Sequence, residues 1–370
     1  MSFGNRAVAM LAMMCLTATP AWSQAGPVRA TLGGRLHYQW NSTSVDQAET
    51  GGGAPIATST FEQRRVRMTV DVAVGDWMSG RIEPEFTMGR LGVRQAWVAF
   101  ELDSLLVLRA GQVKKPFGLV FLTSSGALPV IERGVRIRGL DDALRLAGPA
   151  VHSEVRGALL AGEHFTLLDA QRYAGYDMGL TVEGRRGSVA WTAGVYNGTG
   201  ADQRAEGDDV SSAARVSWQP PVGAALTLGG AWSRRSMNWP AAGSTETRTG
   251  NAFAVDAELG GFRRGLWMIG EVARGENLAT GESFTAAQAI AAYFRPTGGT
   301  RVEGWEPAAR VSWGDPDGAV TGDDGLLLTP GFNVYFAGRN RLMLNWDVYL
   351  PAGDGVATQH GARAQVNLHF

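Results

Sequence analysis

Cysteine is almost absent from the 370-residue chain, which contains only Cys15. Cys15 lies in an N-terminal segment that we expect to be removed, so we expect no disulfides and no thiol chemistry in the mature protein. Long apolar runs are absent as well, because no later segment reaches the roughly 20 residues of a transmembrane helix. If the chain spans a membrane, it must do so as a closed β-barrel, whose strands satisfy one another's backbone groups.

Lysine is the second scarce residue. Lys114 and Lys115 are the only lysines, so nearly all positive charge is arginine, and the formal net charge is −1. A nucleic-acid-binding protein needs a basic surface, so this balance argues against a nucleic-acid partner. Glycine (50 residues) and tryptophan (12) are abundant instead, and barrels use them in tight turns and interfacial belts.

Residues 1–25 have the pattern of a signal peptide that is cleaved after export. Arg6 supplies the positive charge, residues 7–16 form a short apolar core, and small residues up to Ala25 offer a cleavage site. Met14 before Cys15 does not fit a lipoprotein signal. We expect residues 26–370 to form one domain, since no linker interrupts them.

Strict alternation of apolar and polar residues marks strands whose two faces meet different solvents. In residues 65–74, five apolar side chains alternate with Arg65, Arg67, Thr69, Asp71 and Ala73. Residues 361–370 repeat the pattern and end on Phe370. An apolar face, a polar face and a terminal aromatic predict the closing strand of an outer-membrane barrel. The alternative is an edge strand of a soluble sheet.

Sixteen such segments follow one another, joined in turn by short turns and longer polar loops, as in outer-membrane barrels. They cover residues 31–40, 65–74, 81–88, 95–102, 105–113, 178–183, 188–196, 214–219, 225–233, 252–259, 266–273, 286–294, 306–313, 326–336, 341–350 and 362–370. We therefore predict an all-β fold, a transmembrane antiparallel barrel of about 16 strands. The count becomes 18 if residues 151–154 and 165–169 are strands. Pro84 predicts a bulge, and residues 41–59 and 238–250 are predicted as polar loops.

Residues 108–133, LRAGQVKKPFGLVFLTSSGALPVIER, resemble the phosphate-selective porin O and P family of Gram-negative outer membranes. Weaker similarities lie at residues 195–198 (VYNG), 306–310 (EPAAR) and 329–335 (TPGFNVY). The resemblance covers residues 61–370. It implies a sixteen-stranded barrel, usually trimeric, whose third outer loop folds inward and constricts the pore. Residues 114–177, after the fifth strand, match that loop, although residues 139–177 do not align with the family and an N-terminal coiled coil of some members is missing.

Cations on the lumen wall and the inward loop are the candidate functional residues, because charged rings set the electrostatic barrier of a pore. The alternation places Arg65, Arg67 and Arg81 on the lumen face. The resemblance places Lys114 and Lys115 at the entry to the constricting loop and Arg133 along it. An equally open interpretation is structural: Asp71, Glu83 and Glu85 share the same faces and would pair with the arginines.

Enzymatic candidates are weak. His152 and Ser153 are adjacent, which in a strand sends their side chains to opposite faces and prevents a nucleophile–base pair. His37 and His369 would be neighbours in a closed barrel, but two histidines alone make a poor metal site. We expect no enzyme activity and no cofactor. Most tryptophans are interpreted as interfacial belt residues; these are Trp40, Trp77, Trp97, Trp218, Trp232, Trp313 and Trp346.

These observations predict a porin of the bacterial outer membrane that passes small hydrophilic solutes by diffusion. Its predicted partners are outer-membrane lipid, small anions such as phosphate, and two further copies of itself in a homotrimer. A general or carbohydrate-leaning porin and a non-conducting structural or adhesive barrel stay open as alternatives.

Overall fold

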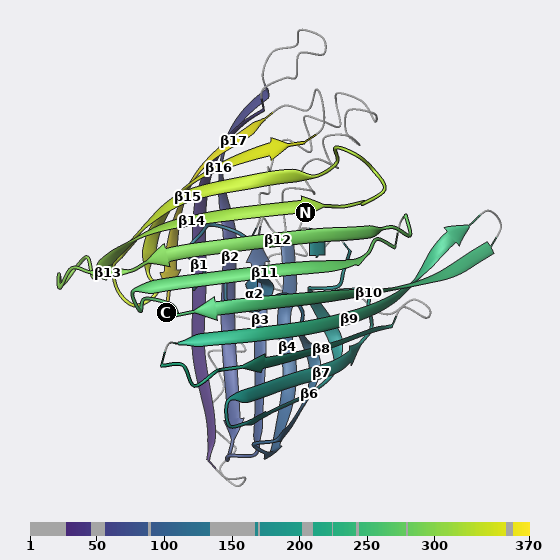
Figure 1. The fold of residues 1–370 in the computed structure, drawn as a ribbon. Coiled ribbons are helices and arrows are strands. Elements are labelled where there is room, and N and C mark those ends of the chain that lie inside the picture. The colour runs from purple at the N-terminus through teal and green to yellow at the C-terminus, as the bar shows by residue number, and fades with distance from the viewer. Residues whose placement is uncertain are drawn as a thin grey trace, which may run out of the picture.

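The computed structural model shows one antiparallel sheet that closes into a barrel (Figure 1). The structure describes residues 27–45, 56–87, 90–133, 167–168, 171–201, 210–223, 225–241, 244–278, 280–352 and 358–370. The strands are β1 Val28–Val45, β2 Ile56–Val74, β3 Met78–Thr87, β4 Arg90–Asp103, β5 Leu106–Lys114, β6 Tyr176–Arg186, β7 Val189–Tyr196, β8 Ser211–Trp218, β9 Leu226–Ala241, β10 Ser244–Leu259, β11 Leu266–Glu276, β12 Ser283–Tyr293, β13 Arg295–Pro296, β14 Gly304–Asp315, β15 Gly325–Tyr335, β16 Arg341–Pro351 and β17 Gln359–His369.

The prediction of a sixteen-stranded barrel is confirmed. β13 has two residues and pairs only with β14, while β12 also pairs directly with β14, so the other sixteen strands of the described chain form the wall. The barrel closes where β1 pairs with β17, with Leu36 opposite Leu368 and Arg35 opposite His369. Residues 151–154, suggested as an extra strand, lie outside the described residues. Of residues 165–169, Leu167 and Leu168 are described and are helical.

The alternation in the sequence sorts the side chains onto the two faces of the wall. Leu32, Ile82 and Leu180 are exposed on the outer face, whereas Glu83 and Thr181 are buried on the inner face. Paired residues share a face, so each inward row of polar side chains continues from strand to strand around the lumen. The outer face is the apolar surface that lipid requires.

Two pairs of strands run further than the alternation predicts. β1 and β2 pair from Val45 opposite Ile56, and β9 and β10 have 16 residues each. Within the loops predicted at 41–59 and 238–250, residues 41–45, 56–59, 238–241 and 244–250 are therefore strand, and the remaining residues lie outside the described part of the chain. A membrane-spanning strand needs about 9–11 residues. The β9–β10 hairpin therefore projects beyond the barrel (Figure 1). A segment beyond the membrane does not need one apolar and one polar face, so the sequence there does not have to alternate.

The predicted bulge at Pro84 is confirmed, because the register between β3 and β4 shifts between Glu83 and Pro84. Glu83 lies opposite Gln95 and Pro84 opposite Val93, so Arg94 of β4 is the extra residue of the bulge. Proline lacks the N–H that a regular ladder needs, which favours an irregularity here. No helix in the described residues is long and apolar enough to cross a membrane. The expected signal peptide, residues 1–25, lies outside the described residues.

The connection between β5 and β6, here called the inner loop, is described at residues 115–133, 167–168 and 171–175. It contains the short helix α2, Leu119–Leu122. The loop leaves the wall at the end of β5. Its hydrogen bonds reach β1 and β2 on one side and β11, β12, β14, β15 and β16 on the other. The described part of the loop therefore lies inside the barrel, as the inward-folding loop was predicted to do.

Candidate functional site

The inner loop begins with a helical turn that Lys114 holds in place. The Lys114 amine donates hydrogen bonds to the carbonyls of Phe121 (2.8 Å) and Leu122 (3.0 Å) at the C-terminal end of α2. A cation is favourable at that end of a helix, where carbonyls lack intrahelical partners. Across the lumen, the Leu119 N–H donates to the Glu271 carboxylate of β11. These bonds fix both ends of the turn.

Glu132 fastens the far part of the loop to β2. Its carboxylate accepts hydrogen bonds from Arg65 at 2.7 and 2.8 Å and forms an ion pair with Arg64 at 2.7 Å. Burial by itself would raise the pKa of the Glu132 carboxyl, but the charges of Arg64 and Arg65 outweigh burial and hold the pKa well below its ordinary value. Glu132 therefore stays ionised at neutral pH.

The loop backbone is bonded to the opposite wall as well. Arg341 donates to the Leu128 carbonyl at 2.6 Å, and Asn333 donates to the Pro129 carbonyl at 2.8 Å. Arg310 donates to the Glu132 carbonyl at 3.3 Å. Buried backbone carbonyls need such partners, and the polar inward positions of β14, β15 and β16 supply them.

An apolar layer backs the loop along β9 to β12 and β14. Phe117, Phe121 and Tyr173 of the loop pack on inward alanines of the wall and on Phe284. Further along, the loop packs Val120, Leu128 and Val130 against Trp267, Ile269 and Ile290. At these contacts the inward side chains are apolar, although Glu271 of β11 and Gln288 of β12 are inward and polar. Contacts of this kind bury apolar area and hold the loop without directional bonds.

The loop and the adjoining wall together gather positive charge. We call this group the basic cluster, and it consists of Arg35, Arg64, Arg65, Arg67, Arg94, Lys114 and Arg133. Arg67 pairs with Glu83 (3.1 Å) and Glu85 (2.6 Å), and Arg35 pairs with Glu83 at 3.1 Å. Arg94 also pairs with Glu85. Five of the seven cations therefore pair with three carboxylates, Glu83, Glu85 and Glu132, while Lys114 and Arg133 donate to backbone carbonyls of the inner loop.

Each of the six predicted site residues has partners in the structure. Arg65 and Arg67 are bound to carboxylates as above, and Arg81 is held by Asp71 at 2.6 and 3.0 Å. Lys115 donates to the Arg172 carbonyl and lies 3.8 Å from Asp177. Arg133 donates to the Val120 carbonyl at 2.9 Å and to the Thr123 carbonyl.

The structure brings four of the six, Arg65, Arg67, Lys114 and Arg133, into the basic cluster. Arg81 lies further along the same wall, one row beyond Glu83. Lys115 belongs to a separate contact with Asp177, which itself accepts from the Gly198 N–H at 3.0 Å. The prediction of six cations as one pore-lining set stays a prediction, since no permeant ion marks the path.

Sequence reasoning missed four members of the site, Arg35, Arg64, Arg94 and Glu132. Arg64 is the extra residue where the register between β1 and β2 shifts. Arg35 has the same signal as Arg65, because it alternates with Leu36 on the lumen face of β1. Arg94 is carried inward by the bulge opposite Pro84, so simple alternation assigns it to the wrong face. Glu132 lies in a loop without periodicity, and only the family's E-R pair singled it out.

The tryptophans divide between the two faces. Trp218 and Trp346 are exposed on the outer face, and Trp77 is exposed in the β2–β3 turn, as belt residues would be. Trp97 is different: it pairs with Arg81 and has Arg109 over its ring at 4.4 Å, so it faces the lumen and the belt interpretation is wrong for it. Trp267 is also inward and packs under the inner loop.

The two histidines at the barrel seam are neighbours, as predicted, with ring centroids 5.4 Å apart. Arg35 and Arg65 lie close to them, which disfavours a bound cation. Among the described residues, no group of three or more His, Cys, Asp or Glu side chains is arranged to hold a metal.

The comparisons with solved structures agree with this architecture. The outer membrane channel DcaP of Acinetobacter baumannii is 14% identical, covers 94% of this chain and 99% of its own, and has a TM-score of 0.56. OprB of Pseudomonas putida at high pH is 10% identical, with 92% and 94% covered and a TM-score of 0.58. OmpT of Vibrio cholerae in a trimer form is 13% identical, with 92% and 99% covered and a TM-score of 0.55. At these identities the likeness establishes the fold alone.

Sequence comparison supplies the family. A search of curated proteins gives no match. The sequence model of the phosphate-selective porin O and P family matches residues 31–261, which is more than half of the chain. This match, the closed sixteen-stranded wall and the loop inside it place the protein in the bacterial outer membrane as a channel rather than an enzyme. The chain belongs to the phosphate-selective porin O and P family.

Proposed function

We propose that this porin is a passive pore that prefers small anions, phosphate among them. The observation that carries the proposal is the charge balance of the basic cluster, in which five arginines pair with three carboxylates and Lys114 and Arg133 add two further basic side chains. Such an excess at the narrowest part of a pore lowers the barrier for anions and raises it for cations. The family's description as phosphate-selective supports the same direction.

Within the cluster, Arg94 is the residue best placed to meet a passing solute. Its side chain is 39% exposed, whereas that of Arg67 is 7% exposed. The buried cations contribute through their field, and Arg94 contributes through direct contact. A guanidinium offers a planar fork that matches phosphate oxygens. We therefore assign Arg94 as the contact residue, with Arg65, Arg67, Lys114 and Arg133 behind it.

A general pore without ion preference is the second candidate. It is favoured by the pairing of Arg65, Arg67 and Arg81 with carboxylates, which a wall can use for stability alone. Under either candidate we propose a homotrimer, by analogy with the trimer form of OmpT of Vibrio cholerae. We also propose that residues 1–25 are cleaved during export.

A bilayer recording tests the proposed anion site. The refolded protein is measured in potassium chloride while inorganic phosphate is titrated into the bath. We expect phosphate to block the chloride current, and we expect Arg94→Gln to weaken that block by about tenfold, the loss of one charge-assisted hydrogen bond. Arg274→Gln is the matched control, because Arg274 is exposed outside the lumen and bonds Ser283. A chloride current that ignores phosphate would support the general pore.

A further inference from the structure

A cavity of about 280 Å³ opens on the inner side of β1 to β4, away from the basic cluster. It lies near the end of the barrel that carries the tight β2–β3 turn at residues 75–77. Outer-membrane barrels have their short turns on the periplasmic side. A solute that has passed the inner loop from outside would meet this cavity next. Nothing described so far uses it.

The strand register explains which side chains meet there. Thr31, Asp71, Arg81 and Trp97 are successive partners across β1, β2, β3 and β4 and form one inward row. The next row toward the turn holds Arg29, Ala73, Ser79 and Ala99. The small side chain of Ala73 in the second row leaves a hollow that Asp71 and Trp97 of the first row border.

Polar groups of both charges converge on the hollow. Asp71 lines the cavity, and its side chain is 42% exposed, so it can bind a solute although it pairs with Arg81 at 2.6 Å in the same row. Thr31 and Ser79 add two hydroxyl groups to the lining. Arg29 is exposed and lines the same cavity, and within the described residues its side chain makes no hydrogen bond or ion pair.

Trp97 supplies an aromatic surface beside these groups. Its indole N–H is engaged by Gln95 at 3.2 Å, and Arg109 lies over the ring at 4.4 Å. The ring is partly exposed and lines the cavity. A ring of this kind, close to hydroxyl groups and a carboxylate–guanidinium pair, offers an apolar face and directional bonds to one ligand.

We propose that this cavity is a binding site for a monosaccharide that carries one acidic group. The sugar ring would pack on Trp97, its hydroxyls would bond to Asp71, Thr31 and Ser79, and the acidic group would pair with Arg29. The size fits, because the volume is below the roughly 300–1,000 Å³ of sites for larger, drug-sized ligands. The acidic group is a carboxylate, as in a sugar acid, or a phosphate, as in a sugar phosphate.

This site is separate from the proposed anion preference, since it shares no residue with the basic cluster. The test is a bilayer recording with glucuronate, glucose 6-phosphate or glucose added on the periplasmic side. We expect the two acidic sugars to interrupt the current at concentrations about tenfold lower than glucose. The more potent of the two shows whether carboxylate or phosphate is the natural group.

Variants connect the effect to the cavity. Arg29→Gln should abolish the advantage of the acidic sugars over glucose. Trp97→Ala should raise the concentration at which each of the three sugars interrupts the current by about tenfold. Arg274→Gln and Trp346→Ala, both on the outer face, are matched controls. They should change neither the advantage of the acidic sugars nor the concentration at which the three sugars interrupt the current. If Trp97→Ala does not assemble into a heat-modifiable barrel, Trp97→Leu replaces it. Equal block by glucose and the acidic sugars, or no change in Trp97 and Arg29 variants, overturns the proposal.

Discussion

Arg65 on β2 donates two hydrogen bonds, at 2.8 and 2.7 Å, to the carboxylate of Glu132 in the inner loop, 67 residues away in the sequence. Arg64 adds an ion pair to the same carboxylate. Glu132 has a positive φ of 63°, which a side chain other than glycine adopts at a cost. The strained turn is therefore held by charge. This carboxylate is one anchor of the inner loop, beside the hydrogen bonds of Lys114, Arg341 and Asn333.

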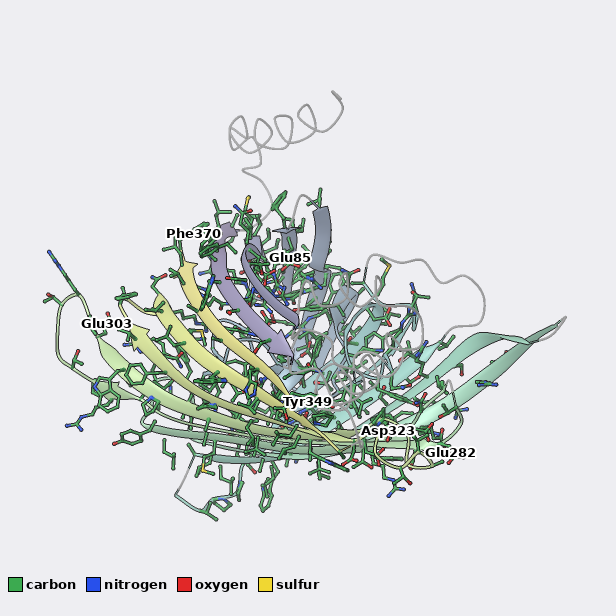
Figure 2. The ribbon with its side chains drawn as sticks, turned by 90° about the horizontal axis from the view of Figure 1, so that it is seen from above. Glu85, Glu282, Glu303, Asp323, Tyr349 and Phe370 are labelled. Atoms are coloured by element: carbon green, nitrogen blue, oxygen red, sulfur yellow. The ribbon has the colours of Figure 1, made fainter. Side chains whose placement is uncertain are left out.

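Replacement of Glu132 by Gln should loosen the loop. The change leaves two buried guanidinium groups without their counter-charge, a loss of about 3–5 kcal/mol for buried pairs. We expect larger and noisier single-channel conductance and a lower temperature for heat-modified migration on a gel. Glu282→Gln is the control, because Glu282 lies in the β11–β12 loop at the rim of the barrel (Figure 2). Unchanged conductance in the Glu132 variant would show that the loop is held elsewhere.

The same carboxylate predicts how conductance depends on pH. The pKa of Glu132 is held well below its ordinary value, so the ionised form stabilises the folded loop. That stabilisation is present above the ordinary value of about 4.3 and is lost only as pH falls through the lowered pKa. Conductance should be constant between pH 7 and pH 5 and should rise at stronger acidity. A transition near pH 6 that Glu132→Gln removes would contradict this assignment.

Asp323, between β14 and β15, predicts that the barrel loses stability as pH rises, whereas the Glu132 contact is lost as pH falls. Burial, together with the charges of Asp315 and Asp317, raises its pKa to about 6. The folded state thus holds the proton more tightly than the unfolded state, and ionisation of Asp323 destabilises the barrel above about pH 6. Asp323→Asn should raise the melting temperature at pH 8 and leave it nearly unchanged at pH 4. Asp76→Asn, in the β2–β3 turn at the other end of the barrel, should leave the melting temperature unchanged at both pH values.

A variant of Phe117 tests whether the apolar layer along β9 to β12 and β14 holds the inner loop in place. It is fully buried against wall alanines and Tyr173, with ring centroids 6.3 Å apart. Phe117→Ala removes a buried ring, which costs about 3–5 kcal/mol in a packed core. We expect a protease to cleave the loop faster in the assembled barrel. Phe253→Ala is the control, because Phe253 is exposed on the outer face. Equal cleavage rates in both variants would show that the apolar layer does not hold the inner loop.

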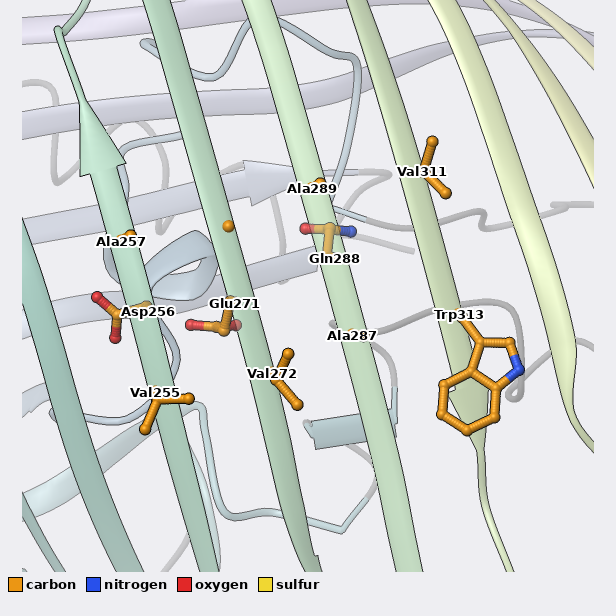
Figure 3. A pocket seen from close by; sticks show the side chains of 11 residues that line it. Val255, Asp256, Ala257, Glu271, Val272, Ala287, Gln288, Ala289, Val311 and Trp313 are labelled. Atoms are coloured by element: carbon orange, nitrogen blue, oxygen red, sulfur yellow. The ribbon is translucent and has the colours of Figure 1, made fainter.

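Much of the wall could be predicted from the sequence, since one physical rule governs it. Strands such as β2 and β16 separate lipid from lumen, so alternation locates them and sorts Arg65 from Val66. The rule fails where both faces meet the same environment. The extension of β9 and β10 lies beyond the barrel, and the inward alanines of β10 and β12 pack under the loop. Figure 3 shows how Asp256, Glu271 and Gln288 nevertheless keep one polar row across β10, β11 and β12.

The partners of the site residues could not be predicted. Alternation placed Arg67 on the lumen face and identified Glu83 and Glu85 as neighbours, and these pairs exist. The contacts of Lys114, Arg133 and Glu132 depend on the path of the inner loop, which carries no periodicity. Arg94 required knowledge of how the bulge at Pro84 turns the opposite strand. Charge at the constriction is therefore a property of the folded loop and not of a local pattern.

The central claim, an excess of positive charge at the constriction, is tested most directly by the reversal potential of the pore in a potassium chloride gradient. The account predicts that chloride permeates better than potassium, and that Arg94→Glu shifts the ratio toward potassium while Arg274→Glu does not. A pore that prefers potassium, with no shift in the Arg94 variant, would contradict the account and leave the arginines as wall pairs.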